Sequence, residues 1–252
     1  MFLTQEGMRL HMKLDMPADS PARCPLVIVI HGFTGHMEER HILAVSQAIR
    51  DAGCAALRVD MYGHGGSDGD FARHTLAHWL RNARAVIDYA RSLDFVTELY
   101  LCGHSQGGLT AMLAGAMMRE HIAGLILLSP AWMIPAQARE GVFLGVRFDP
   151  DRIPAALAPW GLAGSYLRVA RTIRVEEAID RYDGPVLLVH GTEDATVDVR
   201  YGRLAARRYR SAAFVPIAGD THCYDRHLEE VARAVTDWLR RRTAHGQQGF
   251  RC

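Results

Sequence analysis

The sequence lacks paired cysteines, a long apolar run and a marked excess of charge. Its five cysteines are an odd number without paired spacing, which suits reduced thiols in a cytosol better than a disulfide framework. No segment approaches the roughly 18 apolar residues that a membrane span needs, and the first residues have neither the basic nor the apolar region of a secretion signal. We therefore expect a cytoplasmic protein.

The charge balance also disfavours some partners. With 29 basic and 28 acidic residues the formal net charge is +1, so nothing draws the whole chain toward nucleic acid or an anionic membrane. A small neutral molecule is the simpler partner, and a homodimer remains open. No internal repeat is present.

What is present is the composition of an ordinary globular protein, with 49% hydrophobic and 23% charged residues in a chain of 252. We expect one domain over residues 1–252, with a disordered tail after Arg242.

Short apolar runs recur along the chain and predict a sheet. Two runs around Glu6-Gly7, Phe2 to Gln5 and Met8 to Asp15, predict a hairpin because glycine accepts the backbone of a tight turn. Six later runs are almost continuously apolar, as in parallel strands that are covered on both faces. They are Leu26–Ile30, Ala55–Val59, Leu99–Cys102, Gly124–Leu128, Val186–Val189 and Ala213–Ile217.

Helical spacing of apolar residues separates several of these runs. Ile42, Val45 and Ile49 recur every three or four residues, and the same period starts again at Leu228. Strand and helix therefore alternate. The pattern predicts an α/β fold with an eight-stranded, mostly parallel sheet and helices on both faces.

One stretch, residues 131–184, is too long for an ordinary connection of about 2 to 6 residues. It contains prolines, glycines and several aromatic residues, among them Trp160 and Tyr166. We expect a lid inserted above the sheet; the alternative is a surface excursion of weak helices.

The strongest chemical signal is Gly103-His-Ser105-Gln-Gly107 between an apolar strand and a helical segment. This is G-x-S-x-G in the strand–turn–helix context of a nucleophile elbow. The glycines remove the side chains that would collide in the sharp turn, and the serine hydroxyl projects above the sheet. We expect Ser105 to be a nucleophile.

A serine hydroxyl is a weak nucleophile at neutral pH, so it needs a base that takes its proton and an acid that orients the base. Asp194 follows a strand and a glycine turn, with Glu193 and then Asp198 as competitors. His222 lies in the loop after the last strand, whereas His227 falls within the last helix pattern. Ser105, Asp194 and His222 follow the expected order of nucleophile, acid and base.

Acyl transfer also needs two backbone N–H groups aimed at the developing oxyanion. One should come from Gln106, directly after the nucleophile. The other should lie in the loop after the first parallel strand, where Phe33 in His31-Gly-Phe-Thr-Gly35 is our candidate. The alternative is a plain glycine turn.

Metal and nucleotide sites are weaker interpretations. His74 and His78 are four residues apart, and two histidines at this spacing indicate a solvent-exposed helix face more often than a zinc site. His222, Cys223 and His227 could bind a metal, but the triad already accounts for His222. Gly63-x-Gly65 lacks the third glycine of a dinucleotide motif. We expect neither a metal nor an organic cofactor.

Four segments together resemble the bacterial feruloyl, or cinnamoyl, esterases of the α/β-hydrolase superfamily, over nearly the whole chain. Two are widespread in that superfamily, the Ser105 motif and Asp60-Met-Tyr-Gly-His-Gly65. Two are narrower, His31-Gly-Phe-Thr-Gly-His-Met-Glu-Glu-Arg-His41 and Gly219-Asp-Thr-His-Cys-Tyr224. The resemblance implies the α/β-hydrolase fold and hydrolysis of hydroxycinnamate esters such as ferulate, p-coumarate or caffeate esters.

The resemblance also implies that the lid holds the aromatic acyl group, with Tyr166 matching a lid tyrosine that contacts the phenolic hydroxyl. Because a planar acyl group gains from flat apolar walls, we expect Trp160 of the same stretch to bind it as well. Some relatives use a lid aspartate, but this chain has no carboxylate near Pro135-Ala-Gln137. Other acyl hydrolases (a monoglyceride lipase, a thioesterase, a small peptidase) and a non-catalytic binding protein of the same fold remain alternatives.

Overall fold

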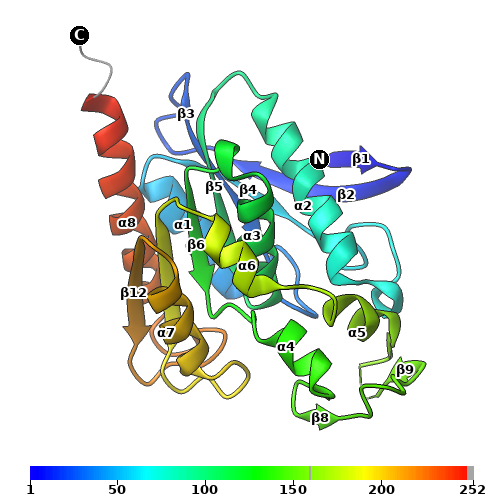
Figure 1. The fold of residues 1–252 in the computed structure, drawn as a ribbon. Helices are drawn as coiled ribbons and strands as arrows, with labels where there is room; N and C mark the ends of the chain where they lie inside the picture. The colour runs from blue at the N-terminus through cyan, green and yellow to red at the C-terminus, as the bar shows by residue number, and fades with distance from the viewer. Residues whose placement is uncertain (159, 249–252) are drawn as a thin grey trace.

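The computed structural model describes residues 1–158 and 160–248, with side chains up to residue 243, so Cys252 lies outside the described part. Its centre is one eight-stranded sheet in the order β1-β2-β4-β3-β5-β6-β11-β12 (Figure 1). The strands are β1 (Phe2–Gln5), β2 (Met8–Asp15), β3 (Cys24–Ile30), β4 (Ala55–Val59), β5 (Val96–His104), β6 (Gly124–Leu128), β11 (Val186–Gly191) and β12 (Ala212–Ile217).

The predicted sheet is confirmed. The strands β1 and β2 form the antiparallel hairpin, β2 pairs antiparallel with β4, and the pairs from β4 to β12 are parallel. All six apolar runs lie within the parallel strands. In β4, β6 and β11 every residue is buried, as in strands covered on both faces, whereas β12 at the edge of the sheet exposes Ala213 and Pro216.

Helices cover both faces of the sheet, as expected. They are α1 (Arg40–Asp51), α2 (Leu76–Arg91), α3 (Gln106–Met117), α6 (Val175–Arg181), α7 (Val199–Arg208) and α8 (Leu228–Gln248). Single turns of 3₁₀ helix occur at η1 (Phe71–Arg73) and η2 (Arg119–His121). Since α8 continues to Gln248, the expectation of disorder after Arg242 is wrong over those residues.

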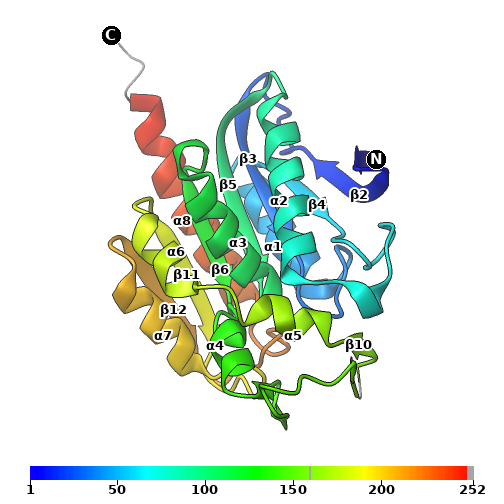
Figure 2. The same ribbon diagram turned by 45° about the vertical axis from the view of Figure 1, so that its right-hand side comes forward.

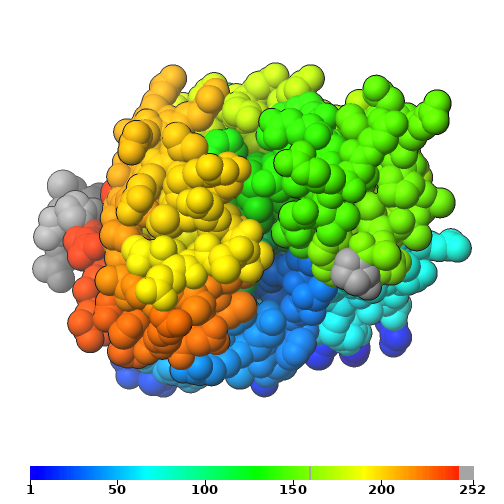
Figure 3. Space-filling model, turned by 90° about the horizontal axis from the view of Figure 1, so that it is seen from below, coloured from blue at the N-terminus to red at the C-terminus, as the bar shows by residue number. Residues whose placement is uncertain are grey.

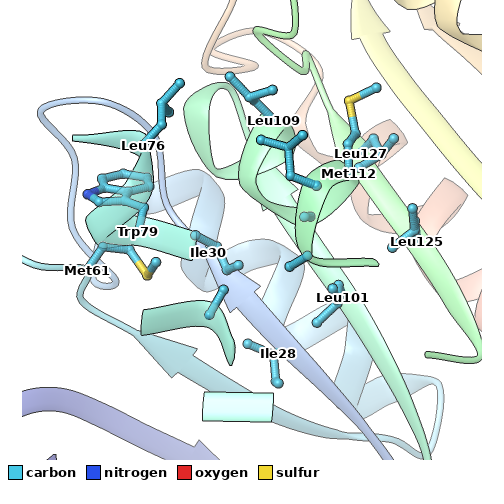
Figure 4. Packing of buried hydrophobic residues seen from close by; sticks show 14 of the residues in the cluster. Ile28, Ile30, Met61, Leu76, Trp79, Leu101, Leu109, Met112, Leu125 and Leu127 are labelled. Carbon is cyan, nitrogen blue, oxygen red and sulfur yellow. The ribbon is translucent and has the colours of Figure 1, made fainter. Parts of the chain in front are cut away.

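Two hydrophobic cores flank the sheet because successive strand residues point to opposite faces. In β3, Ile28 and Ile30 pack on the face that α2, α3, α6 and α7 cover, together with Trp79 (Figure 4). Val27 and Val29 pack on the other face beneath α1 and α8. Figure 2 shows α1 and α8 behind the sheet from this side.

The stretch 131–184 connects β6 to β11, which are parallel neighbours. Its last helix, α6, packs on α3 and acts as the crossover helix of an ordinary strand–helix–strand unit. The remainder is an excursion at the lower edge of the sheet in Figure 1. It comprises α4 (Ile134–Arg139), the hairpin of β7 (Val142–Phe143) and β8 (Val146–Arg147), the hairpin of β9 (Ala156–Leu157) and β10 (Leu162–Ala163), and α5 (Ser165–Ala170).

The excursion therefore follows β6 at the carboxyl edge of the parallel strands, where ligands bind in open α/β sheets. Among the described helices, none is long and apolar enough to cross a membrane.

Candidate active site

Ser105 occupies the sharp turn between β5 and α3. Its φ is 55°, a left-handed conformation that few non-glycine residues adopt, and its ψ is −116°. A Cβ on Gly103 would collide with the Gly107 backbone, and one on Gly107 would collide with the carbonyl oxygens of Ile30 and His31. Glycine is thus required two residues to either side of the serine, and the strain concentrates at Ser105.

Asp194 and His222 come together from the loops after β11 and β12. His222 Nδ1 lies 2.7 Å from Asp194 Oδ2, so it donates its proton to the carboxylate and leaves Nε2 facing away from it. The other carboxylate oxygen accepts the backbone N–H groups of Thr196 at 2.9 Å and Val197 at 2.8 Å. These bonds fix both the carboxylate and the orientation of the imidazole.

The competing acid and base candidates lie elsewhere. The Glu193 carboxylate is exposed and pairs with Arg226. Asp198 caps α7 by accepting the Arg200 N–H at 2.8 Å. The His227 ring lies 3.8 Å from Glu230.

A second histidine, His190, also contacts the acid. It is fully buried, and its Nε2 lies 2.8 Å from the carbonyl oxygen of Val197 and 3.2 Å from Asp194 Oδ2. Burial by itself would raise the pKa of Asp194, but the hydrogen bonds from His190 and His222 hold that pKa well below its usual range. The carboxylate is therefore ionised across the working pH range.

The backbone of His222 is held by two further histidines. The carbonyl oxygen of His222 accepts a hydrogen bond from His104 Nε2 at 2.9 Å, and His41 Nε2 lies 3.1 Å from His104 Nδ1. Because a carbonyl can only accept, the His104 proton is on Nε2, and His41 must donate to the free Nδ1. Burial lowers the pKa of His41 to about 4 and that of His104 well below its ordinary value, so both rings are neutral.

The loop after β3 passes directly beside the nucleophile. A Cβ on Gly32 would lie 3.2 Å from the Ser105 Cβ, closer than side chains usually approach. His31 fixes this loop: its Nδ1 donates to the Gly32 carbonyl at 2.7 Å, and its Nε2 accepts the Met61 N–H at 3.0 Å.

Within the part of the chain that the structure describes, neither the Phe33 N–H nor the Gln106 N–H donates to a protein group. Both backbone donors are thus free for a ligand, as an oxyanion hole requires.

One cavity of about 270 Å³ lies beside the nucleophile. It opens between the excursion and the segments that follow β11 and β12, which are green and yellow to orange in the view from below (Figure 3). Ser105 and His222 line it beside aromatic and aliphatic side chains, and Glu39 lines it as well.

The two substrate-binding candidates differ in position. Trp160 lines the cavity and packs edge-on against Phe143, with ring centroids 5.1 Å apart. Tyr166 is fully buried and is not among the described lining residues. Its hydroxyl donates to Gln106 Oε1 at 2.6 Å, whereas Gln106 Nε2 has no partner among the described residues. The Tyr166 hydroxyl proton is thus already engaged, and the expected contact of Tyr166 with a phenol stays a prediction.

The residues considered for a metal have other contacts. His74 Nδ1 donates to the Phe71 carbonyl at 2.6 Å, and the His78 ring stacks on Tyr62. His41, His104 and Cys223 come close enough to hold an ion, but the two imidazoles are hydrogen-bonded to each other.

Sequence reasoning missed His190, His41, His104 and Glu39. The spacing of His190, four residues before the acid at the end of the same strand, could have suggested a contact with Asp194. His104 directly precedes Ser105, and Glu39 and His41 lie in the His31–His41 segment, but nothing in their spacing indicates their contacts in the site.

A parallel sheet with a strained serine between strand and helix, and an acid and a histidine in the following loops, defines an α/β-hydrolase. The family described as serine aminopeptidase S33 matches residues 21–167, and the chain belongs to it. The resemblance predicted from the motifs is confirmed as well. The solved structure of Est1E from Butyrivibrio proteoclasticus with ferulic acid bound is 53% identical, covers 97% of this chain and 99% of its own, and has a TM-score of 0.96.

Curated relatives are more distant. Rat monoglyceride lipase is 28% identical over 285 residues, which cover 98% of this chain and 91% of the lipase. Human mitochondrial palmitoyl-protein thioesterase ABHD10 is 28% identical over 184 residues, or 69% of this chain and 58% of the thioesterase. For human ABHD12B the matched region covers 74% of this chain and only 51% of the relative.

Proposed function

We propose that this protein is a serine carboxylic-ester hydrolase acting on hydroxycinnamate esters, the feruloyl, p-coumaroyl and caffeoyl esters. The observation that carries the proposal is the 53% identity, over nearly the full length of both chains, to a protein that binds ferulic acid. The cavity beside Ser105 supports it, because a planar acyl group gains from flat aromatic walls such as Trp160 and Phe143.

In the first half of the reaction, Ser105 Oγ attacks the ester carbonyl while His222 Nε2 takes its proton. The tetrahedral oxyanion accepts hydrogen bonds from the Phe33 and Gln106 backbone N–H groups. Asp194 stabilises the imidazolium through Nδ1. When the carbon–oxygen bond to the alcohol breaks, His222 passes the proton to the departing oxygen, and an acyl-enzyme remains.

In the second half, water replaces the alcohol. His222 takes a proton from the water, the hydroxide oxygen attacks the acyl carbon, and the bond to Ser105 breaks as its oxygen recovers the proton. The products are the hydroxycinnamic acid, the alcohol and the free enzyme. The excursion between β6 and α6 acts as the lid that supplies the acyl-binding wall.

The test is Ser105→Ala, assayed on methyl ferulate and with a fluorophosphonate probe. Loss of a triad nucleophile typically costs on the order of 10⁶ in kcat. We expect turnover and labelling to vanish while the thermal melt is retained. A tenth of wild-type activity in the purified variant would assign the nucleophile elsewhere, and an unlabelled, inactive wild type would favour a binding protein.

The acyl preference needs a separate comparison. Methyl ferulate, a monoacylglycerol and a palmitoyl thioester should be compared by kcat/KM on the wild type, because the distant relatives are named for the last two substrate classes. A preference for either lipid substrate would refute the hydroxycinnamate assignment.

Two predictions concern the cellular compartment and the oligomeric state. The cysteines of the described residues are free, which supports a reducing compartment such as the cytosol, and cell fractionation tests this. A homodimer remains a prediction that sedimentation velocity can test.

A further inference from the structure

Glu39 is the carboxylate that lines the catalytic cavity, in a wall whose described residues include no lysine or arginine. It is the N-cap residue of α1, yet its side chain makes no capping hydrogen bond. A role in ending the helix therefore does not explain why this position carries a carboxylate.

The Glu39 carboxylate also has no cation to neutralise it. Among the described residues, the basic group within ion-pair distance is His41, whose Nε2 lies 3.9 Å from Glu39 Oε2. That ring is neutral, and its Nε2 proton points to His104. The carboxylate packs on the Gly35 backbone, where a Cβ would collide with it, and its side chain is 29% exposed.

The position of Glu39 relative to His222 decides which part of the substrate it meets. His222 must reach the departing alcohol oxygen to protonate it, so the alcohol lies on the His222 side of Ser105. Glu39 interacts electrostatically with His222 and with Cys223, the next residue in the cavity wall.

The acyl wall, by contrast, is formed by Phe33, Phe143 and Trp160, whose rings contact one another. Glu39, which lines the same cavity as His222, is therefore assigned to the alcohol side of the site.

We propose that Glu39 selects the alcohol part of the ester, accepting hydrogen bonds from the hydroxyl groups of a neutral polyol and repelling alcohols that carry negative charge. The inference rests on the proposed hydrolase function, and it adds a charge rule for the leaving group. Burial raises the pKa of Glu39, and a hydrogen bond from the His36 backbone together with the nearby His36 and His222 rings opposes that rise. Two like charges several ångströms apart in a partly screened site cost enough to change kcat/KM by about five- to tenfold.

The test compares three caffeoyl esters with one acyl group: methyl caffeate, the neutral polyol ester glyceryl caffeate, and chlorogenate, whose quinate alcohol bears a carboxylate. Glu39→Gln keeps the shape and a hydrogen-bond acceptor but removes the charge, whereas Glu39→Ala removes both. Glu229→Gln, at an exposed position in the first turn of α8, is the matched control for a change of net charge.

We expect Glu39→Gln to raise the chlorogenate-to-methyl caffeate ratio of kcat/KM about fivefold or more, mainly through KM, and to leave glyceryl caffeate little changed. In the wild type, added salt should raise the same ratio. Glu39→Ala should lose several-fold on glyceryl caffeate relative to methyl caffeate. Glu229→Gln should change neither ratio.

A chlorogenate ratio within twofold of wild type in Glu39→Gln, or an equal rise in Glu229→Gln, would overturn the inference. Failure of the proposed function appears differently, as hydrolysis of p-nitrophenyl acetate without hydrolysis of methyl caffeate. In that case the charge rule is measured on the acetate esters of glycerol and of glycolate, which differ in the charge of the alcohol, with the same expectations for the three variants.

Discussion

Replacing Tyr166 by phenylalanine distinguishes two roles for its hydroxyl. The sequence predicted a contact with the phenolic group of the substrate, whereas in the structure this hydroxyl donates to Gln106 Oε1 at 2.6 Å in a fully buried environment. The ring remains in Tyr166→Phe, so no cavity opens. The change leaves the side-chain oxygen of Gln106 without a hydrogen-bond partner, and the amide nitrogen of Gln106 already lacks one among the described residues.

An unpartnered buried acceptor costs about 1 to 3 kcal/mol of stability. For a domain of this size each kcal/mol lowers Tm by about 2 to 4 °C. Because the backbone N–H of Gln106 is the proposed oxyanion donor, loosening this residue should lower kcat. Complete loss of such a donor costs about 10² to 10³, so we expect a loss of up to about tenfold, equal for methyl ferulate and p-nitrophenyl acetate.

The matched control is Tyr182→Phe, which removes a buried hydroxyl that donates to the Ile122 carbonyl at 3.2 Å, remote from Ser105. It should lower Tm and leave kcat unchanged. Thermal melts and initial rates on both esters and on methyl cinnamate measure these outcomes. A Tyr166→Phe loss of activity confined to ferulate, with cinnamate and acetate unaffected, would contradict a supporting role for Gln106 and favour a contact between Tyr166 and the phenol.

Three further outcomes are expected. Asp194→Asn should lower kcat by roughly 10⁴ because His222 loses its fixed tautomer, whereas Asp198→Asn, at a helix cap, should leave the rates nearly intact; equal losses would reassign the acid. Trp160→Ala should lower kcat/KM for methyl ferulate about two- to tenfold and change p-nitrophenyl acetate hydrolysis much less; parallel losses would mean that this ring shapes the whole site. Burial lowers the pKa of His31 to about 3 and that of His41 to about 4. Below about pH 6.5 the unfolded chain therefore takes up protons that the folded protein does not, and the free energy of unfolding should fall. The expected slope is about 1.4 kcal/mol per pH unit for each such histidine, and a free energy of unfolding that is equal at pH 5 and pH 7.5 in urea titrations would contradict it.

The central strands of the sheet could be predicted from the sequence because they are covered on both faces. Ala55–Val59 and Gly124–Leu128 end in the structure where their apolar runs end. The strand at Leu99–Cys102 is longer, Val96–His104, because Thr97 and Glu98 interrupt the apolar run at one end and Gly103 and His104 follow it at the other.

The excursion could be located but not described. Strands of two residues, such as Val142–Phe143 and Leu162–Ala163, are too short to carry a period of two. The lid predicted over residues 131–184 also combined the excursion with α6, a helix that belongs to the layer against α3. Composition alone cannot separate a crossover helix from the loop before it.

Within the site, local context predicted the residues whose backbone geometry is special, Ser105 and its flanking glycines. The supporting contacts could not be predicted, since His104 meets the His222 carbonyl across 118 residues of sequence. Such contacts depend on which strands are neighbours, and the order of strands is a property of the folded sheet.

The placement of the excursion between β6 and the crossover helix α6 has an evolutionary consequence. Insertions, deletions or exchanges between Ala131 and Ile173 need not alter the register of the two strands, since the crossover that joins them is made by α6 afterwards. A new acyl pocket could therefore be acquired by recombination within this one interval, while the hydrolytic apparatus is inherited unchanged.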